Sequence, residues 1–290
     1  MALRLIIAGL RRSGTTIFWR TFRQDSRFVC YDEPFNPHLC VLPAHTRLKA
    51  PEEFVDLIRA DPRAFWEAFT PIHFTQELKT GFSDREAAWL RFLAGTGEAV
   101  ALDTTRCAFK ISALRKAAPA AVLVHLYRPP ASLASSHLLP SSEGRKGQLK
   151  RWAARRGFWS RADRYNGWSF ESIVGESTSS FFAERLRDAG LDAETVYGLP
   201  AVGRLLAYWK VCFERIERDG RREFGDRFVS QSFDRFCRQP EGVVRTIYEV
   251  LGMTPPEPDF SAVHPARGPF EPASPHWKRY RRLLDLPEVE

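Results

Sequence analysis

The sequence predicts an α/β fold in which helices flank a central, mainly parallel sheet. Residues 3–8 and 120–127 are short and almost continuously apolar, which is typical of strands that are covered on both faces. A segment with helical periodicity follows each of these runs, at 15–22 and at 131–138. Strands that alternate with helices favour a parallel sheet, and we expect a single domain that spans residues 1–290.

The remaining elements follow from apolar periodicity and from signals at the ends of helices. Pro51, with two glutamates after it, begins one predicted helix, and Gly220 and Gly252 each end another. The segment 144–180 is basic, aromatic and poorly periodic, so we expect a loop-rich lid there. The further predicted helices are 51–69, 83–93, 201–218, 240–251 and 277–284, and the further predicted strands are 99–102, 108–111 and 228–231.

The charge of the chain indicates an anionic partner. Lys and Arg number 43 and Asp and Glu number 35, which gives a formal net charge of +8. Such a surplus suits nucleic acid, a membrane surface, or a small molecule that bears phosphate or sulfate. Eight basic and two acidic residues fall within 141–166. Because the chain has no polybasic tail, we expect this charge to belong to a folded surface.

Other features argue against several classes of protein. The five cysteines form no CxxC pair and the seven histidines form no HExxH motif, so we expect reduced thiols and no metal. No apolar run approaches the ~20 residues that a membrane span requires. The apolar run near the start of the chain is followed by Gly9, Arg11 and Arg12, so it is too short for a signal peptide. We therefore expect a cytoplasmic protein without a transmembrane segment.

A glycine-bounded loop lies between the first predicted strand and the first predicted helix. It reads Gly9-Leu-Arg-Arg-Ser-Gly14-Thr-Thr16. Backbone amides and a helix N-terminus in this context can hold an anion. Thr15 stands where nucleotide triphosphatases have a lysine, so ATP hydrolysis is disfavoured, and the positive charge lies at Arg11 and Arg12. The alternative is a tight turn with two solvated arginines.

The sequence Arg12-Ser-Gly-Thr-Thr16 resembles the 5′-phosphosulfate loop of sulfotransferases, which use 3′-phosphoadenosine 5′-phosphosulfate (PAPS) as co-substrate. In motif style it is most similar to bacterial and carbohydrate-type members. The resemblance implies the P-loop-like fold of that family and a catalytic cation, Arg12, against the bridging and sulfuryl oxygens. It also implies that the co-substrate is bound by Arg11, Arg12, Ser13, Gly14, Thr15 and Thr16.

Two further motifs fit the same family. Arg128 ends the buried strand and Ser136 follows eight residues later, which resembles the family's site for the 3′-phosphate. An arginine fork reads a phosphate through two hydrogen bonds. The alternative is that Arg128 pairs with a carboxylate and Ser136 faces solvent. Phe233 occupies the position of a family tyrosine that lies near adenine, and the alternative for it is a core side chain.

The base that takes the acceptor proton is less direct to identify. Lys110 matches a catalytic lysine of the family, but Ser112 stands where cytosolic members have their histidine base. Tyr31-Asp-Glu33-Pro-Phe resembles the Glu-Pro signature of other members, so Glu33 is the predicted base, with Asp32 and Asp103 in reserve. The alternative for Glu33 is a surface carboxylate in a turn before Pro34, and the alternative for Lys110 is a half-buried lysine at a strand end that pairs with an acid.

Together these observations predict a sulfotransferase that moves a sulfuryl group from PAPS to a hydroxyl or an amine by in-line transfer. We expect a small-molecule, glycan or lipid acceptor, bound through variable segments at about 35–100 and 144–200, and no nucleic acid partner. The oligomeric state and the role of Arg145-Lys146-Gly147 are left open. The alternatives are a nucleotide or small-molecule kinase with a degenerate loop, in which Asp103 binds the metal, and a non-catalytic basic anion-binding module.

Overall fold

The computed structural model describes residues 3–41, 52–138, 149, 158–161, 179–264 and 274–289. Contacts within the chain divide it into two compact units. The sheet unit comprises Met1–Tyr127 and Arg215–Pro265, and the helical unit comprises Arg128–Glu214 and Ala266–Glu290. The single domain over 1–290 therefore stays a prediction. Most of the expected lid at 144–180, including Arg145-Lys146-Gly147, lies outside the described residues.

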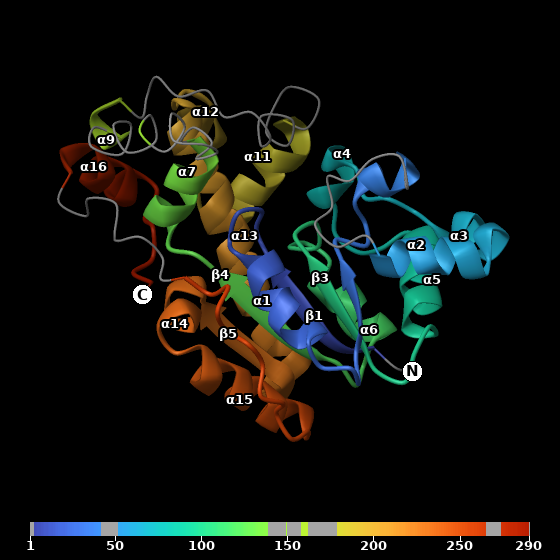
Figure 1. Ribbon diagram of the computed structural model, residues 1–290. Coiled ribbons are helices and arrows are strands. Elements are labelled where there is room, and N and C mark those ends of the chain that lie inside the picture. Colours follow the sequence, from blue (N-terminus) through green and yellow to red (C-terminus); the bar gives the residue numbers. More distant parts are fainter. Residues whose placement is uncertain are drawn as a thin grey trace. The chain divides into compact units, whose positions relative to one another are not determined.

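Five parallel strands form the sheet of the sheet unit, in the order β2-β3-β1-β4-β5 (Figure 1). Their bounds are β1 Leu3–Gly9, β2 Val29–Asp32, β3 Val100–Thr104, β4 Val122–Tyr127 and β5 Phe228–Ser232. The predicted α/β class with a central parallel sheet flanked by helices is confirmed. From β1 the chain continues to β2 on one side, and from β4 to β5 on the other. Open α/β sheets bind ligands outside the carboxyl ends of the strands at such a reversal, here between β1 and β4.

The helices of the sheet unit bury an aromatic core against β1 and β4. The ring of Phe18 lies 4.8 Å from that of Phe236, and Phe22 stacks on Tyr248 at 5.7 Å. These side chains come from α1 (Thr15–Arg23), α14 (Phe233–Arg238) and α15 (Pro240–Leu251). The other helices of this unit are α2 (Glu52–Ala60), α3 (Pro62–Ala68), α4 (Phe74–Glu77), α5 (Asp84–Ala94), α6 (Ile111–Ala117) and the last part of α13 (Ala201–Phe224).

The described part of the helical unit consists of helices. They are α7 (Pro130–Leu138), α9 (Phe158–Arg161), α11 (Ser179–Asp188), α12 (Ala193–Tyr197), the first part of α13, and α16 (Pro275–Leu283). Trp159 of α9 lies 5.1 Å from Trp277 of α16, ring to ring. Lys210 Nζ of α13 donates to the Asp285 carbonyl at 2.7 Å. These contacts attach the C-terminal helix to its own unit. No helix in the described ranges is long and apolar enough to cross a membrane.

Three of the sequence predictions are wrong, each for a physical reason. The helix expected over 51–69 is two helices, because the Asp61 side chain accepts from Ala64 N and caps a new helix at Pro62. The strand expected over 108–111 is a turn followed by α6, since Lys110 N donates to the Cys107 carbonyl at 2.9 Å. Such a four-residue apolar run does not distinguish a strand from a helix start.

The third wrong prediction is the end of α13. The helix does not stop at Gly220 but continues to Phe224. A Cβ at Gly220 would lie 2.3 Å from the ring of Phe228, so this glycine allows β5 to pack closely against the helix. The other predicted helices and strands within the described residues are confirmed, with ends that differ by a few residues. The five cysteines all lie within the described residues, and none of them forms a disulfide.

Candidate functional site

The glycine-bounded loop connects β1 to α1 as predicted. Gly14 and Arg12 adopt the left-handed conformation, with φ of 92° and 71°. The Gly14 carbonyl accepts from Ile17 N and Phe18 N at 3.1 and 3.2 Å, which starts the helix. No side chain caps this N-terminus, and no acidic residue lies in the first turn of α1. A helix N-terminus without a capping side chain attracts an anion, although the Asp103 carboxyl approaches the Thr15 side chain in the first turn.

Both glycines of the loop are needed for close packing. A Cβ at Gly9 would lie 2.4 Å from the Leu126 carbonyl oxygen of β4. A Cβ at Gly14 would lie 2.3 Å from the ring of Phe233. Phe233 is 4% exposed and belongs to the aromatic core, which supports the core alternative for this residue. Contact with adenine stays a prediction.

The two loop arginines have different surroundings. Arg11 forms a fork with the carboxylate of Glu77: Nη1 donates to Oε2 at 2.9 Å, and Nη2 donates to Oε1. Its guanidinium also lies over the ring of Phe74, at 5.2 Å from the centroid. Arg12 is exposed at the tip of the loop. Of the two, Arg12 is therefore the cation that a ligand from solvent meets first.

Acidic side chains gather at the carboxyl ends of β2 and β3. Asp32 and Asp103 are register partners on these neighbouring strands, and both are buried. Burial raises the pKa of Asp103 well above its usual value, and the charges of Asp32 and Glu33 raise it further, while the nearby Thr15 side chain partly opposes the rise. Asp103 thus keeps its proton to a higher pH in the folded than in the unfolded chain. Its contribution to stability is lost as the pH rises through that interval.

Glu33 follows β2 directly, in a strained turn. Its φ is 52°, and Asn36 N donates to its carbonyl at 2.9 Å while Glu33 N donates to the Asp103 carbonyl at 2.8 Å. The side chain is 15% exposed, and its Oε2 lies 3.9 Å from Nε of Arg106. Burial raises the pKa of Glu33, although Arg106 and the other donors around it oppose the rise. A carboxylate whose pKa is raised toward neutrality is a better general base.

Sequence reasoning missed Arg106 and Glu77. Arg106 is 7% exposed; its Nη1 donates to Glu77 Oε1 and to the Ile72 carbonyl at 3.2 Å. Glu77 is 3% exposed and accepts from both Arg106 and Arg11. One signal was available: Arg106 is a charged residue two positions after a buried strand, where functional side chains of parallel sheets gather.

Lys110 is buried rather than placed on a strand end. It is 2% exposed, and its Nζ donates to the Gly81 carbonyl at 2.6 Å and lies 3.9 Å from Glu86 Oε1. Burial lowers its pKa, which the charge of Glu86 partly opposes. These contacts support the alternative of a buried lysine paired with an acid. A catalytic role of Lys110 stays a prediction.

Arg128 and Ser136 belong to the helical unit, whereas the loop belongs to the sheet unit. Arg128 follows β4, and its carbonyl accepts from Trp209 Nε1 at 3.0 Å. Ser136 is half-buried in the second turn of α7, which begins at Pro130. The eight-residue spacing therefore joins a strand end to the side of the following helix. Their role toward a 3′-phosphate stays a prediction.

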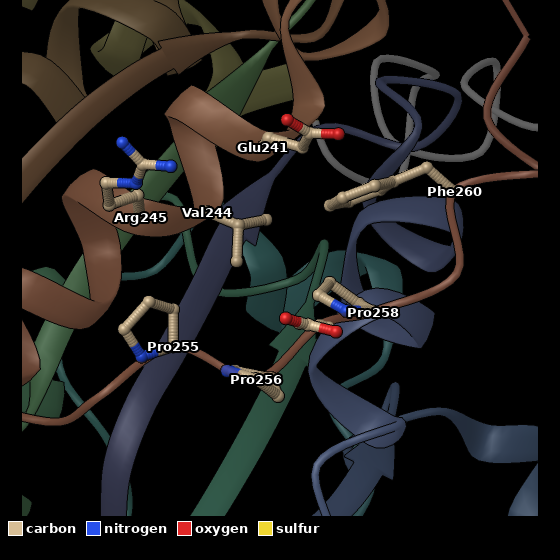
Figure 2. A pocket seen from close by; sticks show the side chains of 8 residues that line it. Glu241, Val244, Arg245, Pro255, Pro256, Pro258 and Phe260 are labelled. Atoms are coloured by element: carbon tan, nitrogen blue, oxygen red, sulfur yellow. The ribbon is translucent and has the colours of Figure 1, made fainter.

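A cavity of about 410 Å³ opens elsewhere in the sheet unit, between α15 and the extended segment after it. Figure 2 shows Glu241, Val244 and Arg245 opposite the prolines and Phe260 of that segment. None of the predicted site residues lines this cavity. Among the residues that the structure describes, no group of three or more His, Cys, Asp and Glu side chains could hold a metal ion.

Comparisons with known proteins found similarity to solved structures. No protein-family model and no curated protein matches the chain. A sulfotransferase from Alicyclobacillus acidocaldarius is similar over 98% of this chain and 96% of its own, with 17% identity and a TM-score of 0.43. The sulfotransferase domain of the Synechococcus PCC 7002 olefin synthase is similar over 96% and 87%, with 15% identity and a TM-score of 0.44.

A third similar structure is the sulfotransferase domain from the curacin biosynthetic pathway. It is similar over 98% of this chain and 98% of its own, with 11% identity and a TM-score of 0.46. These similarities assign no role to any residue of this chain.

Proposed function

We propose that the chain is a sulfotransferase that takes a sulfuryl group from PAPS and passes it to a hydroxyl or an amine. The observation that carries the proposal is the pairing of an uncapped, lysine-free phosphate loop with a carboxylate at the end of a nearby strand. The loop suits a 5′-phosphosulfate, because its amides and the N-terminus of α1 attract an anion. Glu33 suits the acceptor proton, because burial raises its pKa.

Each group has a defined task in the transfer. The acceptor oxygen attacks the sulfur as the bond from sulfur to the bridging oxygen breaks, and the bonding electrons pass to the leaving phosphate. Glu33 takes the proton of the acceptor. Arg12 and the amides of the loop stabilise the charge that develops on the leaving phosphate. Arg128 and Ser136 hold the 3′-phosphate, which distinguishes PAPS from ADP and ATP.

One observation favours a second candidate, a kinase with a degenerate loop. Asp103 is the second-last residue of β3, the strand next to β1, and the Thr15 side chain approaches it. A loop hydroxyl beside a strand-end carboxylate is an arrangement that can hold Mg²⁺ with a nucleotide. Against this candidate, position 15 carries no lysine for the β- and γ-phosphates. The raised pKa of Asp103 also makes its ionised form, which binds cations, less favourable than that of an ordinary carboxyl.

Thermal unfolding with a panel of nucleotides separates the two candidates. Adenosine 3′,5′-bisphosphate is expected to stabilise the chain by about 2.7 kcal/mol at a hundredfold excess over its Kd, because only the folded state binds it. ADP or ATP with Mg²⁺ is expected to stabilise it much less, since neither has a 3′-phosphate. Equal or larger stabilisation by Mg²⁺-ATP would favour the kinase. Stabilisation by the bisphosphate without turnover of PAPS on any acceptor would favour a non-catalytic anion-binding module.

A further inference from the structure

Four charged side chains form one network at the glycine-bounded loop, and one of them, Arg11, belongs to that loop. The carboxylate of Glu77 accepts from Arg11 and from Arg106, and Arg106 in turn lies 3.9 Å from Glu33. Two positive and two negative charges therefore balance one another. The ring of Phe74 lies beneath both guanidiniums, at 5.2 Å from Arg11 and 5.6 Å from Arg106.

Arg106 is held in place from several directions. Its Nη1 is fixed by Glu77 and by the Ile72 carbonyl, and its backbone N donates to Thr104 Oγ1 at 3.3 Å. The side chain is almost fully buried, so it cannot swing into solvent. Of this fixed guanidinium, the Nε edge is the part nearest to Glu33.

We propose that Arg106, anchored by Glu77, is a positioning residue that orients the carboxylate of Glu33 and balances its negative charge. The inference rests on the proposed function, in which Glu33 is the base. The backbone of Glu33 is held in a left-handed turn, in which its N donates to the Asp103 carbonyl, and its carboxylate lies on the Nε side of Arg106. Without Arg106, the partly buried carboxylate would lose a cation that favours its ionised form.

The groups around Glu33 have opposite effects on its pKa. Burial raises its pKa, and Arg106, a hydrogen bond from Thr105 and the charge of Arg11 lower it, while Glu77 raises it. Asp103 and the Cys107 thiol also lie near Glu33, since the charge of Glu33 raises the pKa of each, and Asp32 next to Glu33 in sequence acts on Asp103 in the same sense. Because Arg106 is the largest opposing influence, removing it should raise the pKa of Glu33. The acidic limb of the kcat profile should then move to higher pH.

The test is a titration of the Glu33 carboxyl carbon by NMR, with the signal assigned by its loss in Glu33→Gln. In Arg106→Gln the titration is expected to move to higher pH, and in Arg106→Lys it is expected to return toward the wild-type position. The matched control is Arg63→Gln, because Arg63 is 85% exposed and pairs with Glu67 on α3. It should leave the Glu33 titration unchanged. A purely structural role of Arg106 would lower the unfolding temperature without moving the titration.

A measurement on the unaltered protein keeps the test independent of folding. The Arg106 Nε–H resonance is expected to shift with the same midpoint as the Glu33 carboxyl, and to lose this response in Glu33→Gln. The inference would be overturned if the Arg106 Nε–H chemical shift did not change when Glu33 ionises. It would also be overturned if the Glu33 titration midpoint were unchanged in folded Arg106→Gln. Absence of sulfuryl transfer with the coupling intact would refute the proposed function and leave the positioning role standing.

Discussion

Replacing Glu33 by glutamine is expected to lower kcat for sulfuryl transfer by ~10²–10⁴-fold, the usual contribution of a general base. Affinity for adenosine 3′,5′-bisphosphate should stay near that of the wild type, because the lost interaction acts in the transition state. Glutamine keeps the shape of the side chain but cannot accept the proton. The measurement is the release of the bisphosphate from PAPS, with an acceptor found by screening, beside calorimetric titration of the nucleotide.

The control for this variant is Glu67→Gln, a change on α3 where the glutamate is 65% exposed and pairs with Arg63. It should leave both kcat and nucleotide affinity unchanged. Near-normal turnover in Glu33→Gln would show that Glu33 is not the base and would indicate Asp32 or Asp103 instead. A large loss of stability with little loss of kcat would instead identify Glu33 as a structural turn carboxylate.

Replacing Gly14 by alanine is expected to destabilise the fold by about 2–6 kcal/mol and to abolish stabilisation by the bisphosphate. The new Cβ would lie 2.3 Å from the ring of Phe233, and φ at this position is 92°. Left-handed strain and overpacking each cost roughly 1–3 kcal/mol. The loop must then shift, and its amides lose their alignment toward an anion. Chemical denaturation with and without ligand measures both effects.

Two further variants separate strain from overpacking. Gly81→Ala introduces left-handed backbone strain without overpacking, because φ is 77° there but no atom lies within 4 Å of the new Cβ. It should cost less than Gly14→Ala and should not weaken nucleotide binding. Adding Phe233→Leu to Gly14→Ala should recover part of the lost stability, since contacting residues couple. Full additivity of the two changes would show that the contact between Gly14 and Phe233 does not hold the loop.

The features of the fold that could be predicted are local ones. The strand β1, the loop and α1 follow from one apolar run, two glycines and one helical face, all within about twenty residues of sequence. The edge strand β2 was missed, because Val29–Asp32 is too short to show a period and pairs only with β3, far along the chain. The break at Asp61 was readable as a cap followed by proline, but the apolar periodicity hid it.

The candidate site divides in the same way. Arg12 and Glu33 were predicted because each lies in a short motif with its own signature, and their roles stay predictions. Glu77 and Arg106 carry no such signature: Glu77 lies 66 residues from Arg11 and 29 from Arg106, and only tertiary packing brings them together. For Lys110 the sequence resemblance was misleading about local structure. It placed this residue on a strand, whereas the chain turns there and begins α6.

The proposed function requires that the loop between β1 and α1 holds the 5′ end of a 3′-phosphorylated adenine nucleotide. A crystal structure of the chain with adenosine 3′,5′-bisphosphate tests it most directly. We expect the 5′-phosphate within hydrogen-bond distance of the backbone amides of Gly14–Thr16, and the 3′-phosphate on the guanidinium of Arg128. A nucleotide seated instead in the cavity lined by Val244 and Phe260, or a loop without phosphate at saturating nucleotide, would contradict it.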